Sequence, residues 1–263
     1  MIFLLSGEGK TDFGQKNPTS GGVTVEYGPL SYILSKMVEE KFCYSPIELD
    51  NSNPDGCFYF FSKSELCDYS KNLLNSRKLT GMPGQKSSSL KGHGRLAFAL
   101  GLKAIEISAE KNDEVIPVFF RDTDNSTDRD YIDKLESIKD GFTRAKTGPK
   151  NIPVLAKPKS EAWLLCIADD YCHGSVYEEG PANDDSPNSL KKQLGIKLAD
   201  LKFTKDGYNY GNEDLCNFIK NFDLNFDKLC KELKSFKDFY SSFQVATQNA
   251  NNQQDESSII LNN

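Results

Sequence analysis

Short, uninterrupted apolar runs alternate with amphipathic stretches along the first two thirds of the chain. The apolar runs predict buried strands at residues 2–5, 58–61, 115–120 and 151–156. Between them, apolar residues recur every three or four positions. This spacing predicts helices at residues 29–42, 96–107, 131–138 and 160–171. Strands that alternate with helices indicate an α/β fold whose sheet is mainly parallel.

The last third of the chain has a different pattern. Residues 175–212 are rich in Gly, Asn, Asp and Pro and predict loops, whereas 215–222 and 226–236 predict two amphipathic helices. We therefore divide the chain into an α/β domain at 1–172 and a helical appendage at 173–243. The α/β domain contains a basic insertion at about 43–94, and the polar residues 244–263 predict a disordered tail.

The composition argues against a membrane-spanning protein and against a disulfide-rich secreted protein. The 263 residues are 38% hydrophobic, and the mean hydropathy of -0.54 is that of a water-soluble chain. No apolar run reaches the roughly 20 residues that a membrane-spanning helix requires, and the apolar run IFLL at residues 2–5 is too short for a signal peptide. The seven cysteines include no CxxC pair, so we expect a cytoplasmic protein without a disulfide framework and without a membrane partner.

The distribution of charge predicts an anionic partner. The net charge is -6, yet no acidic residue occurs between Asp68 and Glu106 or between Asp140 and Glu161. These two windows hold seven and five basic residues, which favours contact with DNA or RNA over a purely solvated surface. Candidate nucleic-acid contacts are Lys86, Lys91, Arg95, Lys146 and Lys150.

The stretch SGEGKTD (residues 6–12) follows the first strand and admits two interpretations. Its GKT resembles the end of a phosphate-binding P-loop, but that motif requires glycine where this chain has Leu4. The P-loop interpretation is therefore excluded. Glu8 then becomes a carboxylate at the carboxyl end of a parallel strand, which is the edge where open α/β sheets bind ligands.

A second acidic pair, Asp122 and Asp124, follows the strand at 115–120. Mg²⁺ and Mn²⁺ prefer hard oxygen ligands and leave coordination positions open for water and phosphate. Glu8 at one strand end and an Asp-x-Asp pair at another therefore predict a divalent metal site suited to phosphodiester chemistry.

This combination resembles the Toprim domain of primases, topoisomerases and the overcoming-lysogenization-defect (OLD) nucleases. The segment EGKTD at residues 8–12 is similar to the E-G-x-T-[ED] start of stand-alone Toprim-like proteins in bacterial defence loci, and KPKSEAWLL at 157–165 is similar to a later element of theirs. The resemblance covers about residues 1–170 and implies a Toprim-like (Rossmannoid) fold. The insertion before Asp122 departs from the smallest Toprim domains.

The resemblance also implies roles for individual residues. Glu8 would bind metal or act as general acid or base, and Asp122 and Asp124 would bind Mg²⁺ or Mn²⁺. Glu161 resembles the residue that supports a second metal in OLD-type nucleases, and Asp128 is a looser metal candidate. Either Lys159 or Lys157 would stabilise charge on the phosphate.

We therefore predict a metal-dependent nuclease acting on DNA or RNA. The resemblance implies an effector of anti-phage defence that works with an ABC/SMC-type ATPase, and the amphipathic helices at the end of the chain suit a partner, a homodimer or packing within the chain. A non-catalytic Toprim-like subunit that holds nucleic acid is one alternative. A haloacid-dehalogenase-like phosphatase is another, because FFRDTDNS (residues 119–126) and the aspartates of IADDY (167–171) imitate its motifs.

Overall fold

The computed structural model describes residues 1–19, 22–52, 56–75, 90, 92–124, 127–204 and 209–260. A sheet of four parallel strands, in the order β4-β1-β5-β6, forms its centre. The strands are β1 (Ile2–Ser6), β4 (Phe58–Phe60), β5 (Val115–Asp122) and β6 (Ile152–Ala156). The predicted α/β class, with a parallel Rossmannoid sheet and a C-terminal helical region, is confirmed.

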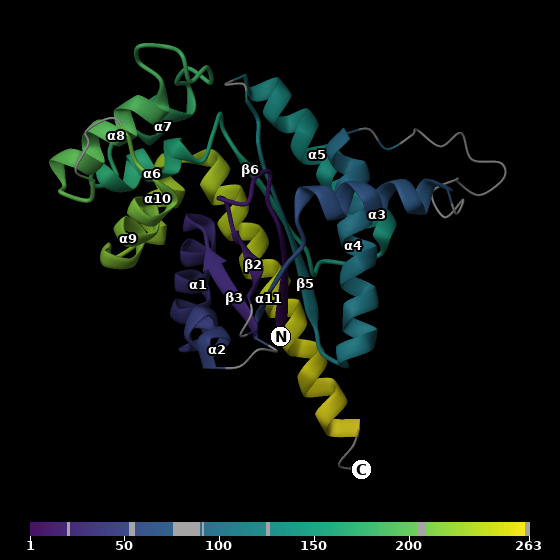
Figure 1. Ribbon diagram of the computed structural model, residues 1–263. Helices are drawn as coiled ribbons and strands as arrows, with labels where there is room; N and C mark the ends of the chain where they lie inside the picture. Colours follow the sequence, from purple (N-terminus) through teal and green to yellow (C-terminus); the bar gives the residue numbers. More distant parts are fainter. Residues whose placement is uncertain are drawn as a thin grey trace.

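Helices cover both faces of this sheet (Figure 1). On one face lie α1 (Pro29–Phe42) and α11 (Lys234–Ile260). On the other face lie α3 (Lys63–Asn75), α4 (Gly92–Lys111) and α5 (Asp128–Ala145). Within the described ranges, no helix is both long and apolar enough to cross a bilayer.

Each face of the sheet has its own apolar core, because successive side chains of a strand point to opposite faces. Phe120 of β5 belongs to the core beneath α1 and α11, whereas Phe119 belongs to the core beneath α3, α4 and α5. The same alternation continues to the end of β5. Arg121 therefore lies on the α3–α5 face and Asp122 on the α1 face, at the carboxyl edge of the sheet.

An antiparallel hairpin follows β1 in a stretch whose composition predicts a loop. Its strands are β2 (Gly14–Thr19) and β3 (Gly22–Tyr27). Gly14 has a φ of 109°, and a Cβ added there would lie 1.9 Å from the Glu26 carbonyl oxygen, so the position requires glycine. Among the described residues, the hairpin pairs with no strand of the main sheet. Val25 and Tyr27 of β3 pack against the core, but the polar strand β2 leaves little trace in the sequence pattern.

Short helices extend the α1 face beyond the sheet. They are α6 (Glu161–Ala168), α7 (Gly174–Glu178), α8 (Leu190–Asp200), α9 (Asn212–Asn221) and α10 (Phe226–Glu232), and α2 (Pro46–Ser52) precedes β4. Helices α7 and α8 lie where the composition predicts loops. Leu190, Leu194 and Leu198 of α8 are buried at a spacing of four residues, but the charged residues between them mask that pattern in the sequence.

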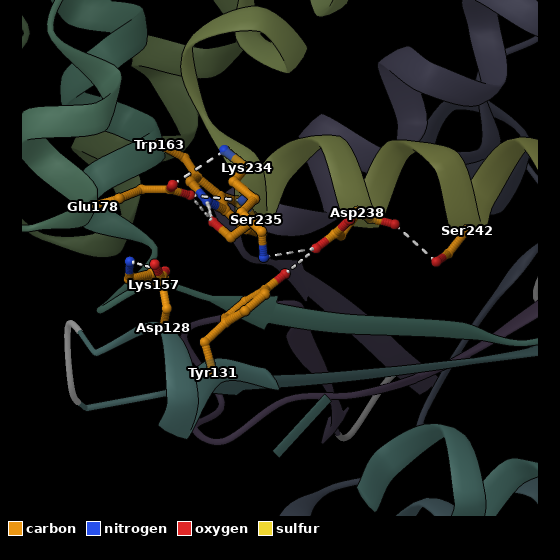
Figure 2. Close-up of polar contacts among 9 residues, drawn as sticks. All are labelled: Asp128, Tyr131, Lys157, Trp163, Glu178, Lys234, Ser235, Asp238 and Ser242. Atoms are coloured by element: carbon orange, nitrogen blue, oxygen red, sulfur yellow. Dashed lines mark hydrogen bonds and ion pairs between the residues drawn. The ribbon is translucent and has the colours of Figure 1, made fainter. Parts of the chain in front are cut away.

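Trp163 and Glu178 anchor the start of α11 (Figure 2). The Trp163 indole is fully buried, donates a 2.7 Å hydrogen bond to the Ser235 hydroxyl and stacks on Phe239. The Glu178 carboxylate accepts hydrogen bonds from the backbone amides of Lys234 (3.1 Å) and Ser235 (2.7 Å). Glu178 thus satisfies amides of the first turn of α11 that have no partner within the helix.

Helix α11 extends into the polar stretch whose composition predicts disorder. Helix α11 continues to Ile260, and Ala246 and Ala250 are buried. The Lys41 ammonium of α1 donates to the Gln244 backbone carbonyl (3.1 Å) and the Thr247 hydroxyl (2.8 Å). Ala246 and Ala250, four positions apart, pack the described part of this helix into the core. The disordered tail at 244–263 stays a prediction.

Candidate functional site at the carboxyl edge of the sheet

A tight turn places Glu8 at the carboxyl end of β1. The Asp12 carboxylate holds this turn by accepting hydrogen bonds from the backbone amides of Glu8 and Gly9, both at 2.7 Å. A Cβ added at Gly7 would lie 2.8 Å from the same carboxylate oxygen, which explains the glycine between the strand and Glu8. The SGEGKTD segment is therefore a carboxylate-bearing turn, closed by its own last residue.

The Glu8 carboxylate lies against both neighbouring segments of the edge. It forms a 3.0 Å ion pair with Lys63 at the start of α3, with its side chain 37% exposed. Partial burial raises the pKa of Glu8, but Lys63, the Arg121 guanidinium and the Asp122 backbone amide outweigh burial and lower it. Glu8 is therefore ionised at neutral pH and lies beside Asp122.

Asp122 ends β5 opposite Ala156 of β6, and one of its oxygens accepts a 3.0 Å hydrogen bond from the Ser160 amide at the start of α6. Burial raises the pKa of Asp122 well above its usual range, and the negative charges of Glu161, Asp12 and Asp124 raise it further. Four carboxylates from three segments thus repel one another at one edge of the sheet.

Glu161 and Lys159 occupy the loop between β6 and α6. Burial raises the pKa of Glu161, while Lys159 opposes that increase. The Lys159 ammonium forms a 2.8 Å ion pair with Asp184 and also acts electrostatically on Glu161 and Asp124. Asp124 itself is exposed, with a φ of 52°, and its amide donates to the Pro158 carbonyl. The structure therefore places Glu8, Asp122, Asp124, Glu161 and Lys159 in one neighbourhood.

Asp128 and Lys157 pair with each other. Their ion pair measures 2.7 Å, and Lys157 is buried whereas the Asp128 carboxylate is 71% exposed (Figure 2). Burial of a lysine ammonium requires such a partner. This pair accounts for both residues structurally and supplies no contact to Glu8 or Asp122 among the described residues.

The predicted nucleic-acid contacts are spread over both ends of the sheet. Arg95 is exposed near the start of α4, at the carboxyl edge, whereas Lys146 and Lys150 follow α5 at the amino edge. Lys150 forms a 2.7 Å ion pair with Glu114, just before β5. Helix α5 runs back along the sheet and carries its last residues away from Glu8. Lys86 and Lys91 lie outside the described residues.

Arg121 is a site residue that the sequence interpretation overlooked. Its side chain is only 1% exposed, its guanidinium lies 4.2 Å from the centroid of the Phe119 ring, and Nη1 donates to the Phe120 carbonyl. Within the described part of the chain, its buried Nη2 has no hydrogen-bond partner. The sequence contains one signal for this role, which is an arginine directly after the apolar run VFF. A cation buried without a full set of partners is costly, so such an arginine indicates a functional position.

The carboxylate oxygens at this edge are ligands that suit a hard divalent cation, but the described residues do not bring three carboxylates together around one point. Among the described residues, no group of three or more His, Cys, Asp or Glu side chains is close enough to hold a metal ion. Mg²⁺ often binds through one or two carboxylates and keeps several waters. Glu8 follows β1 and Asp122 ends the neighbouring strand β5, in surroundings with excess negative charge, so these two carboxylates are the candidates for that smaller requirement.

Comparison of the chain with protein-family models, curated proteins and solved structures finds no match. The Toprim resemblance therefore stays a prediction from short motifs. The functional interpretation rests on the side chains described above, and above all on the meeting of Glu8 with Asp122.

Proposed function

We propose that this protein is a divalent-metal-dependent phosphodiesterase that cleaves DNA or RNA. The observation that supports this most directly is that two distant segments meet: the Asp122 backbone amide helps to lower the pKa of the Glu8 carboxylate at the carboxyl edge of β1 and β5. Parallel α/β sheets bind their ligands at this edge.

In this proposal Glu8 and Asp122 hold the cation, which would be Mg²⁺ or Mn²⁺ and would supply Lewis-acid stabilisation of the phosphate. Asp124 and Glu161 add negative charge to the same neighbourhood. Lys159, which acts electrostatically on both of them, is the nearest predicted cation for a phosphate oxygen. Lys157 contributes less directly, because it is buried against Asp128.

A non-catalytic subunit that holds nucleic acid is the second candidate. It is favoured by the ion pair between Lys63 and Glu8, which occupies the carboxylate that catalysis needs. The phosphatase alternative is disfavoured by the position of Asp169. That residue follows the last turn of α6, whereas Asp122 contacts the first, so the two aspartates lie at opposite ends of the helix. A role in anti-phage defence beside an ABC-type ATPase stays a prediction from the resemblance.

The decisive experiment measures cleavage of end-labelled DNA and RNA by the full chain, with Mg²⁺, with Mn²⁺ and with EDTA. We expect metal-dependent cleavage that falls at least about a hundredfold in Glu8→Gln and in Asp122→Asn, because each removes one charged metal ligand. Asp140→Asn is the matched control, since Asp140 is exposed on α5 and pairs only with Arg144 among the described residues.

Equal cleavage by the wild type and both site variants would reject the proposal. Binding of nucleic acid without any cleavage in Mg²⁺ or Mn²⁺ would instead identify the non-catalytic subunit.

A further inference from the structure

A cavity of about 870 Å³ includes Glu8 in its lining. Its walls come from the turn after β1, the start of β2 and the junction between β4 and α3. Cavities of this size usually hold ligands as large as a nucleotide. Glu8 lines this cavity and is also one of the two residues of the proposed metal site, so a ligand inside the cavity would lie next to that site.

The charges that line the cavity favour an anion. Lys10, Lys16 and Lys63 contribute three ammonium groups, against the carboxylates of Glu8 and Glu65. Glu65 is engaged with the amide (2.8 Å) and hydroxyl (2.6 Å) of Ser62 at the start of α3.

Lys63 pairs with Glu8, whereas no ion pair of Lys10 or Lys16 occurs among the described residues. The buried Arg121 guanidinium adds positive charge behind the wall, acting on Glu8 and on Cys67, which both line the cavity. The cavity therefore offers cations to a phosphate group.

Aromatic rings line the same cavity. Phe60 and Phe61, at the carboxyl end of β4, are half-buried and contribute to its wall. A partly exposed ring beside lysines is a combination that single-stranded nucleic-acid sites use, with the base against the ring and the phosphate against the cations.

We propose that this cavity takes one unstacked nucleotide of a single-stranded nucleic acid, with its phosphate toward the lysines and its base against Phe60. The inference rests on the proposed phosphodiesterase function and names its substrate class. A base inside a duplex would have to leave its pair and its stack to enter the cavity, which is unfavourable. Single strands and unpaired ends are therefore the expected substrates.

Binding measured in EDTA tests the cavity separately from catalysis. The probes are a 12-nucleotide single-stranded DNA, the same sequence as a duplex, adenosine 5′-monophosphate and inorganic phosphate, each added to the full chain. We expect the single strand to bind at least about tenfold more tightly than the duplex. Adenosine 5′-monophosphate should compete with the single strand, and inorganic phosphate should compete more weakly because it lacks a base to stack.

Two variants and one control locate the binding. Lys16→Gln removes a charge from the cavity, and Phe60→Leu removes an aromatic face while keeping an apolar side chain against Tyr27. Each should weaken single-strand binding at least about fivefold. Lys71→Gln is the control, because Lys71 pairs with Asp68 on the exposed face of α3 and does not line the cavity. Far-ultraviolet circular dichroism verifies that each variant is folded.

The possible outcomes separate the cavity assignment from the proposed phosphodiesterase function. Equal affinity for single strand and duplex, or unchanged binding by folded Lys16→Gln and Phe60→Leu, would overturn the cavity assignment even if cleavage is observed. Single-strand binding that depends on Lys16 and Phe60, without cleavage in any metal, would retain the cavity and reject the phosphodiesterase. Competition by adenosine 5′-monophosphate without binding of the oligonucleotide would indicate a free nucleotide as ligand and overturn the single-strand assignment.

Discussion

Two groups of buried polar side chains differ in how completely they are paired. At the start of α11, the Glu178 carboxylate accepts hydrogen bonds from two backbone amides and from the Ser235 hydroxyl, which itself accepts one from Trp163 (Figure 2). At the carboxyl edge of the sheet, carboxylates repel one another and Arg121 retains an unpartnered buried nitrogen. The first group stabilises the fold, whereas the second stores unfavourable charge where a ligand is expected.

The largest effect on stability should come from breaking the fully paired group. Glu178→Ala leaves two amides of α11 and the Ser235 hydroxyl without their buried acceptor. We expect the free energy of unfolding to fall by about 3 kcal/mol, measured by urea denaturation at pH 7. Glu179→Ala, at the exposed neighbouring position, should change it by less than about 0.5 kcal/mol. Similar losses in both variants would contradict the role assigned to Glu178.

The second prediction concerns the pH dependence of the repulsive group. Burial raises the pKa of Asp12 to about 6, although the amides of Gly9 and Glu8 oppose that increase. The folded state therefore binds this proton more tightly than the unfolded state, and its stability decreases as the pH rises from about 4 to 6.

Asp12→Asn removes this titration while its side-chain oxygen can still accept the Glu8 and Gly9 amides. Relative to the wild type, the variant should gain about 2 kcal/mol in free energy of unfolding between pH 4 and pH 8. Urea denaturation across that range measures the difference. A difference that is independent of pH would show that Asp12 is not destabilised in its ionised form.

A well-paired aspartate should behave in the opposite way. Asp169 accepts contacts from Lys197 (2.5 Å), His173 (2.8 Å) and Tyr177 (3.0 Å). The hydrogen bond from Lys197, followed by that from His173, lowers the pKa of Asp169 to about 2. Burial acts in the opposite direction but is the weaker effect. This contribution to stability is present above about pH 4 and is lost as the pH falls through about 2.

Asp169→Asn should therefore lower the free energy of unfolding by about 1 kcal/mol at pH 7, and the loss should vanish near pH 2. Denaturation curves of both proteins at the two pH values provide the measurement. A loss that persists at pH 2 would mean that packing rather than charge explains it.

The smallest effect is expected at Asp122. Asp122→Asn keeps an oxygen that can accept the Ser160 amide and removes the charge that Glu161, Asp12 and Asp124 repel. We expect the free energy of unfolding at pH 8 to stay constant or to rise by up to about 1 kcal/mol, although catalysis is lost. A fall of more than about 1 kcal/mol would identify Asp122 as a structural residue only. Asp140→Asn is again the control.

The sequence predicts the sheet well and the chemistry around it less completely. Buried parallel strands are continuous apolar runs, so β1, β5 and β6 are visible, and the carboxylates that follow β1 and β5 must share one edge. The roles of Asp12 and Arg121 depend on contacts between segments and cannot be deduced from local pattern. The same holds for the pairing of Lys157 with Asp128.

The elements that the sequence pattern misses are also explained by their packing. The hairpin β2–β3 and helix α8 bury too few consecutive residues to stand out from a polar composition. The end of α11 is polar, but it inherits its helical conformation from a first half that carries Phe236, Phe239 and Phe243. Helix formation is cooperative, so a well-packed start extends order into residues that would not fold alone.

Because α11 is the last helix of the chain, it limits when the sheet can be covered during folding on the ribosome. The strands β5 and β6 are complete by Ala156, yet the helix that covers one of their faces begins only at Lys234. Throughout the synthesis of the intervening segment, that face presents side chains of β6 such as Val154 to the surrounding solution. Nascent chains released before α11 emerges therefore carry a bare hydrophobic surface, which is the feature that chaperones recognise.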